Sequence, residues 1–160
     1  GGGGGNAGES YLLAWYFAAH HTSIDCWEKR QQKGFLFTIG DEPTLLSVPG
    51  SVLKQLMDGG QLASTVSATD LLREAMEQYH VFHIHIQETG SGQRTDRIPH
   101  WRELLQDNLL VAKHHSEVPD LIAEAIKKHL GVQAAPEQET VAEEKQQEVD
   151  SEEKPPKVVL

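Results

Sequence analysis

The chain has 160 residues, of which 38% are hydrophobic, and it carries a formal net charge of -10. This size suffices for one domain with an apolar core, whereas the negative charge argues against general nucleic-acid binding, which needs clustered Lys and Arg. No apolar run reaches the roughly 18 residues that cross a bilayer, and the lone Cys26 is typical of a reducing compartment. We therefore expect a cytoplasmic protein without nucleic-acid or membrane partners.

The chain opens with a glycine-rich segment that leads into a helix. Five glycines and the sequence Asn6-Ala-Gly-Glu9-Ser10 precede residues 11–21, where apolar residues recur at helical spacing. A glycine-rich loop at the start of a helix is a common ligand-binding element of α/β sheets. Because a mature domain is not expected to begin with five glycines, this start also suggests that N-terminal strands of the fold are missing.

Strand and helix patterns alternate along the middle of the chain. Residues 35–39 form a short apolar run between glycines, which predicts a fully buried strand. A loop with one short helix near residues 52–57 follows. Ser67-Ala-Thr-Asp70 is typical of a capping box, so a helix is expected after Ser67. Residues 81–87 are predicted to form the second strand.

The C-terminal half continues this alternation. We expect a short helix at 100–106, a third strand at 109–113, and a last helix that Ser116 caps and Gly131 ends. This order implies parallel strands with helices on both faces. The prediction is a doubly wound, mainly parallel α/β sheet of Rossmann-like type, and three strands are few for such a sheet.

The composition changes near the C-terminus. Residues 132–160 are rich in Gln, Glu, Pro and Lys and contain few large apolar residues. Such a segment cannot bury enough apolar surface to offset its ordering entropy. We therefore predict a domain over residues 1–131 and a disordered acidic tail over 132–160.

Oxygen-bearing side chains occur in two loops that a parallel sheet would place at the same edge. Glu9 and Ser10 lie in the glycine-rich loop, and Asp41 and Glu42 directly follow the first predicted strand. Hard oxygen ligands from different loops suit Mg²⁺ or a similar cation. The alternative is that Glu9 and Ser10 cap the helix and that the two acids after the strand begin a turn.

These motifs resemble the latter part of a von Willebrand factor type A (vWA) domain of a bacterial and phage branch. That branch has a Gly-Gly-Gly-x-x-x-Glu-Ser-Tyr-like loop and an Ile-Gly-Asp-Glu strand end. The resemblance covers residues 1–10, 35–43, 81–87 and 100–131. It implies a sheet whose upper edge holds a metal-ion-dependent adhesion site built from three loops. Asp41 matches the acid of the third loop, and Glu9 followed by Ser10 matches the second, which usually carries Thr. The first loop has no counterpart here, so the resemblance implies an incomplete site.

The resemblance further implies a non-enzymatic interaction domain. Asp41, Glu9 and Ser10 would hold Mg²⁺, or Mn²⁺ or Ca²⁺, and an acidic side chain of a protein partner would complete the coordination. Asn6 and Glu42 are then expected to contact that partner. The alternative is an α/β hydrolase or phosphotransfer-like enzyme in which Asp41 is the catalytic acid or nucleophile.

Histidines form several small groups in the sequence. His83 and His85 share one face of the second strand, and packing as neutral rings is expected there in preference to zinc binding. The pairs His20-His21 and His114-His115 are adjacent and diverge on any regular element. We therefore interpret both pairs as poor chelates.

Overall fold

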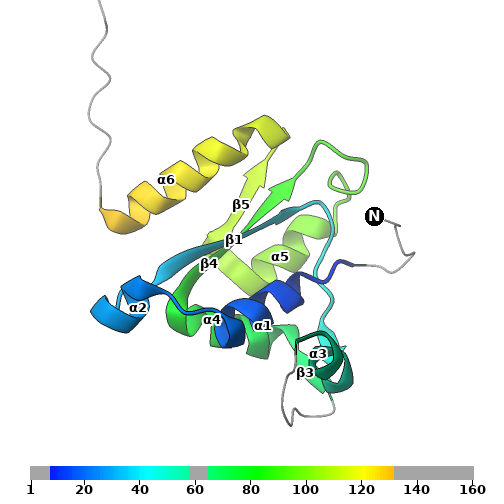
Figure 1. Cartoon of the computed structure of the whole chain (residues 1–160). Coiled ribbons are helices and arrows are strands. Elements are labelled where there is room, and N and C mark those ends of the chain that lie inside the picture. The colour runs from blue at the N-terminus through cyan, green and yellow to red at the C-terminus, as the bar shows by residue number, and fades with distance from the viewer. Residues whose placement is uncertain (1–7, 58–64, 132–160) are drawn as a thin grey trace, which may run out of the picture.

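A computed structural model describes residues 8–57 and 65–131 (Figure 1). Asn6 and the predicted tail at 132–160 lie outside these ranges. The described residues form a mixed α/β structure with a three-stranded sheet in the order β1-β4-β5 and a separate two-stranded sheet, β2-β3. In chain order the elements are α1 (Tyr11–His21), α2 (Asp25–Arg30), β1 (Gly34–Gly40), β2 (Ser47–Pro49), α3 (Gly50–Met57), β3 (Thr65–Ser67), α4 (Ala68–Gln78), β4 (Tyr79–Ile86), α5 (Arg97–Leu105), the 3₁₀ turn η1 (Gln106–Asn108), β5 (Leu109–Ala112), the 3₁₀ turn η2 (His115–Glu117) and α6 (Val118–Leu130).

The three-stranded sheet is parallel throughout. β1 pairs with β4 from Gly34 opposite Tyr79 to Gly40 opposite His85, and β4 pairs with β5 up to Ile86 opposite Ala112. The predicted parallel pairing is therefore confirmed. Because the strands run in the same direction, the loops that follow them all leave from one edge of the sheet.

Helices cover both faces of this sheet, as the alternation predicted. Figure 1 shows α6 on one side and α1, α4 and α5 on the other. The larger core lies under α1, α4 and α5 and includes Trp15, Leu71 and Trp101, while Ile84 and Ile86 face the smaller core under α6. This double coverage explains why residues 81–86 of β4 are all buried, including the histidines at 83 and 85.

Two helix ends follow local sequence signals and a third does not. The Ser67 hydroxyl oxygen accepts a hydrogen bond from the Asp70 backbone N–H at 3.1 Å, which confirms the cap of α4. Gly131 ends α6 in a left-handed conformation with φ of 67°. The predicted cap at Ser116 is wrong, because a 3₁₀ turn occupies 115–117 and Glu117 precedes α6 instead.

The first strand differs from its prediction in burial. In β1 only Thr38 is buried, and Ile39 is 46% exposed, so this strand is not fully covered. Within residues 8–57 and 65–131, no strand pairs with the outer edge of β1. The helix α2 and the antiparallel pair β2-β3 were not predicted. Their segments are too short to show a clear period.

Among the described residues, none of the helices is both long enough and apolar enough to cross a membrane.

Candidate functional site

The loops at the carboxyl edge of the sheet bring Glu9 next to the segment that follows β1. The Glu9 backbone N–H donates to the Pro43 carbonyl at 2.8 Å, and the Glu9 carbonyl accepts from the Leu45 N–H at 3.0 Å. These bonds form a parallel bridge between Glu9 and Thr44. The start of α1 is thereby held beside the loop that carries Asp41 and Glu42, although these loops are about thirty residues apart in sequence.

The Tyr11 hydroxyl is influenced by the acidic side chains of both loops. The pKa of this hydroxyl is raised to about 12, mainly because the residue is partly buried and then because Asp41 and Glu9 place negative charge nearby. Glu42 adds a smaller electrostatic contribution in the same direction, while a backbone hydrogen bond from Glu42 acts against it. Three carboxylates from two loops therefore lie close enough to one hydroxyl to change its ionisation.

Gly40 makes room for Tyr11 at the end of β1. A Cβ atom at position 40 would overlap with the Tyr11 hydroxyl oxygen. The Tyr11 ring also packs edge-on against His83 and Trp101, with centroid distances of 5.0 and 5.3 Å. The glycine before Asp41 thus lets an aromatic ring lie across the strand end.

The loop between β4 and α5 positions both acids that follow β1. The Thr89 hydroxyl donates to one Asp41 oxygen at 2.6 Å. Ser91 donates to one Glu42 oxygen at 2.5 Å, and the Arg97 guanidinium contacts the other at 2.9 Å. Both Glu42 oxygens are therefore engaged, whereas Asp41 receives one hydrogen bond from the part of the chain that the structure describes.

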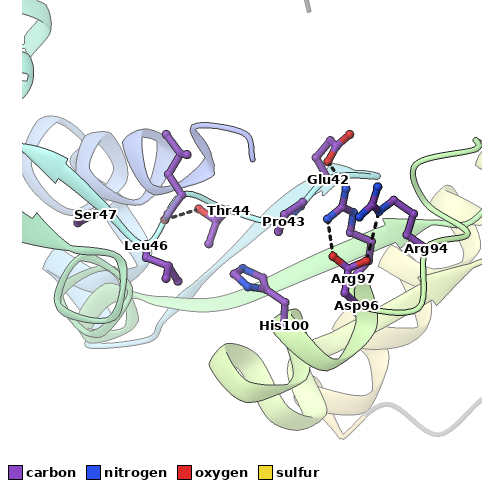
Figure 2. Close-up of a pocket in the computed structure, with 10 residues that line it drawn as sticks. Glu42, Pro43, Thr44, Leu46, Ser47, Arg94, Asp96, Arg97 and His100 are labelled. Atoms are coloured by element: carbon purple, nitrogen blue, oxygen red, sulfur yellow. Dashed lines mark hydrogen bonds and ion pairs between the residues drawn. The ribbon is translucent and has the colours of Figure 1, made fainter. Parts of the chain in front are cut away.

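A pocket of about 720 Å³ adjoins Glu42 (Figure 2). It lies between residues 42–47 and the start of α5. Arg97 is only 8% exposed in this wall and pairs with Asp96 at 2.9 Å as well as with Glu42. Arg94 and Asp96 complete the charged side of the pocket, so its two positive and two negative side chains balance.

The sequence did not predict this pocket. One of its walls contains buried polar atoms that lack a hydrogen-bond partner among the described residues. The Arg97 Nε and His100 Nε2 atoms are buried and have no hydrogen-bond partner among the described residues. Figure 2 shows the Arg97 and His100 side chains on the same side of the pocket. These polar atoms, beside a polar rim, suit a hydrogen-bonding ligand better than an apolar one.

His83, a histidine of β4, packs against residues next to the site. His83 is fully buried and stacks on Trp101 with ring centroids 3.5 Å apart, while its Nδ1 contacts the Thr38 hydroxyl at 2.9 Å. Burial lowers the pKa of His83 to about 3, with smaller contributions from His85 and His100. The ring is therefore neutral at ordinary pH, which agrees with the interpretation of a packed histidine.

Trp101 and His85 form hydrogen bonds to the two loops that adjoin the site. The Trp101 indole N–H donates to the Glu42 carbonyl at 3.1 Å. His85 Nε2 donates to the Gly92 carbonyl at 2.8 Å, and a Cβ at Gly92 would overlap with the Ile86 carbonyl. The loop after β4 is thus folded back tightly over the strand end.

A second group of titratable side chains lies at the same edge, after β4 and β5. Glu88 contacts His115 Nδ1 at 2.6 Å and His114 Nε2 at 3.4 Å. Hydrogen bonds from His115 lower the pKa of Glu88, and the nearby His114 adds to the effect. The interpretation of His114 and His115 as diverging rings is therefore wrong, because the chain turns between them.

The side chains of Glu9, Ser10 and Asp41 have the chemistry of a hard-cation site. All three offer oxygen atoms, and Glu9 and Ser10 are exposed. Ser10 occupies the N-cap position of α1 but makes no side-chain hydrogen bond to the helix. Its hydroxyl is thus not used for capping, which was the alternative explanation for this residue.

No protein-family model, curated protein or solved structure matches the chain.

Proposed function

We propose that this chain belongs to a non-enzymatic interaction domain of the vWA type that binds a protein partner through a divalent cation. The observation that carries the proposal is the backbone bridge between Glu9 and Thr44, which holds the loop of Glu9 and Ser10 beside the loop of Asp41 and Glu42. Loops far apart in sequence meet there, at the carboxyl edge of a parallel sheet, where α/β folds bind their ligands.

Asp41, Glu9 and Ser10 are the residues that would hold the cation. Carboxylate and hydroxyl oxygens from separate loops are the ligands that Mg²⁺ takes, and Mn²⁺ or Ca²⁺ could replace it. The bound ion would supply a directional positive charge to which an acidic side chain of the partner binds. Because few protein ligands surround the ion, we expect this chain alone to bind it weakly.

The surrounding contacts support separate roles for the two acids after β1. Thr89 orients Asp41 through one oxygen and leaves the other without a partner among the described residues. Glu42 is held by Ser91 and Arg97 at the rim of the pocket. We propose that Asp41 binds the ion and that Glu42, with Asn6, helps to form the surface that contacts the partner.

An enzymatic role for Asp41 as acid or nucleophile has less support. The group that contacts its carboxylate is the Thr89 hydroxyl, which is no general base at neutral pH. Among the described residues no histidine bonds to Asp41, since His83 and His85 bond to Thr38 and Gly92. These contacts favour binding over acid–base catalysis.

Titration of the full chain with Mg²⁺ by calorimetry, and with Mn²⁺ by electron paramagnetic resonance, tests this proposal. We expect a dissociation constant near the millimolar range. Asp41→Asn, which removes one negative charge with little change in shape, should weaken binding at least about tenfold. The control is Asp107→Asn, because Asp107 is the same residue type but is exposed and lies in η1, before β5 and so at the opposite edge.

The two variants give opposite outcomes if the assignment is right. Asp107→Asn should bind like the parent chain, and circular dichroism should show that both variants remain folded. Unchanged Mn²⁺ affinity in Asp41→Asn would contradict the assignment of this residue. Tight binding that survives the substitution would place the ion elsewhere in the chain.

A further inference from the structure

The parallel register of β4 and β5 brings two short loop segments together. Ile86 lies opposite Ala112, and the Gln87 N–H donates to the Ala112 carbonyl at 2.9 Å. Glu88 and His114 each follow the end of this pairing by two residues. Both residues therefore lie at the same edge of the sheet, equally far along the chain from the last paired residues of their strands.

The turn after β5 directs two consecutive histidines toward one carboxylate. His114 has extended backbone angles, with φ of -133° and ψ of 144°, and His115 begins the 3₁₀ turn η2. This change of conformation brings the two ring centroids within 5.1 Å. The His115 backbone N–H also donates to Glu88 at 3.1 Å, which holds the carboxylate in place.

The spacing of the potential ligand atoms suits a small metal ion. His115 Nδ1 lies 2.6 Å and His114 Nε2 3.4 Å from the Glu88 oxygens, and one ligand atom from each residue lies within 4.8 Å of the other two. Ligand bonds near 2.0–2.1 Å in a tetrahedron separate ligand atoms by about 3.3 Å. Small rotations of these exposed side chains are enough to bring the three ligand atoms to the spacing of a tetrahedral site.

We propose that Glu88, His114 and His115 form a binding site for Zn²⁺ or a similar transition-metal ion. Two imidazole nitrogens and one carboxylate suit Zn²⁺, Co²⁺, Ni²⁺ or Cu²⁺ better than Mg²⁺. Three protein ligands leave a fourth position for water or a group from another molecule. All three side chains are exposed, so the ion can enter without opening the fold. This site is separate from the cation proposed at Asp41.

The chain offers a closely matched comparison for this cluster. His20 Nε2 contacts Glu74 at 2.8 Å and is also exposed, with 42% of its side chain accessible. In the part of the chain that the structure describes, no third His, Cys, Asp or Glu completes a group there, whereas Glu88, His114 and His115 do form one. The metal affinity that depends on the single His20–Glu74 contact can thus be compared with that of the three-ligand cluster.

The test uses Co²⁺ absorption spectroscopy and Zn²⁺ calorimetry on the full chain. The parent should show visible Co²⁺ bands of a low-coordinate nitrogen and oxygen site, which an equimolar addition of Zn²⁺ removes. His114→Ala, His115→Ala and Glu88→Gln should each weaken Zn²⁺ binding at least about tenfold. His20→Ala should leave both the bands and the affinity as in the parent.

Two further measurements keep the result interpretable. Thermal melting of every variant without metal checks the fold, and these exposed substitutions should leave the melting temperature nearly unchanged. Asp41→Asn should bind Zn²⁺ like the parent, so failure of one metal site does not decide the other. Parent-like Zn²⁺ affinity in a His114→Ala, His115→Ala double variant would overturn the proposal, as would loss of binding in His20→Ala.

Discussion

Acid should destabilise this protein through His83. Its ring is fully buried against Trp101, and burial lowers its pKa from 6.5 in the unfolded chain to about 3. Below pH 6.5 the unfolded chain therefore binds a proton at this ring that the folded chain does not. The free energy of unfolding falls as pH falls, and this loss continues until the folded-state pKa of about 3 is reached.

The size of the effect follows from one proton. Each pH unit below the unfolded pKa costs about 1.4 kcal/mol, so His83 should remove about 2 kcal/mol of stability between about pH 7.5 and pH 5. His83→Phe keeps an aromatic ring for stacking on Trp101 but cannot titrate. Thr38, which contacts His83 in the parent, retains the Phe82 carbonyl at 3.2 Å as an acceptor.

Urea unfolding of the parent and of His83→Phe at both pH values isolates this contribution, because His85 and His100 are present in both proteins. The parent should lose about 2 kcal/mol more than the variant on going to the lower pH. A difference below about 0.5 kcal/mol would refute the reasoning. Ring ¹⁵N chemical shifts of the parent provide an independent check. A His83 resonance that titrates near the ordinary pKa of histidine would also refute the reasoning.

Two further predictions concern local packing and a helix cap. Gly40→Ala should lower the free energy of unfolding by about 1–3 kcal/mol, because the Tyr11 ring is held by aromatic neighbours and cannot simply move aside. Adding Tyr11→Phe should restore part of this loss in thermal melts, and a double variant no more stable than Gly40→Ala would contradict the overlap. Ser67→Ala should cost about 1 kcal/mol in urea unfolding by removing the cap of α4. A conservative Ser67→Thr should keep most of that stability, and equal losses in both variants would exclude the cap as the cause.

Features that depend on neighbours in sequence were predictable. The Ser67 cap, the end of α6 at Gly131 and the alternation of strands with helices all follow from local patterns. The same alternation predicted a parallel sheet, and with it the common edge to which Glu9 and Asp41 belong. Local chemistry and simple topology were sufficient for that part of the candidate site.

Features that depend on strand register and loop path were not predictable. Adjacent histidines diverge on a regular helix or strand, so His114 and His115 could be brought to Glu88 only by an irregular turn at the end of β5. The burial of Arg97 likewise depends on its two acidic partners, Glu42 and Asp96, of which Glu42 comes from a distant loop. An arginine in a polar loop is expected to be exposed without such partners.

The loop between β4 and α5 contacts both ends of this edge through consecutive residues. Glu88 contacts His115, and the next residue, Thr89, donates a hydrogen bond to Asp41. His85 holds the same loop through a hydrogen bond to the Gly92 carbonyl. Substitutions within such a network are not additive, and their coupling energies commonly reach about 0.5–3 kcal/mol. The loss measured for one residue of a contacting pair, such as Asp41 with Thr89, therefore includes this coupling, and a double-mutant cycle is needed to separate it.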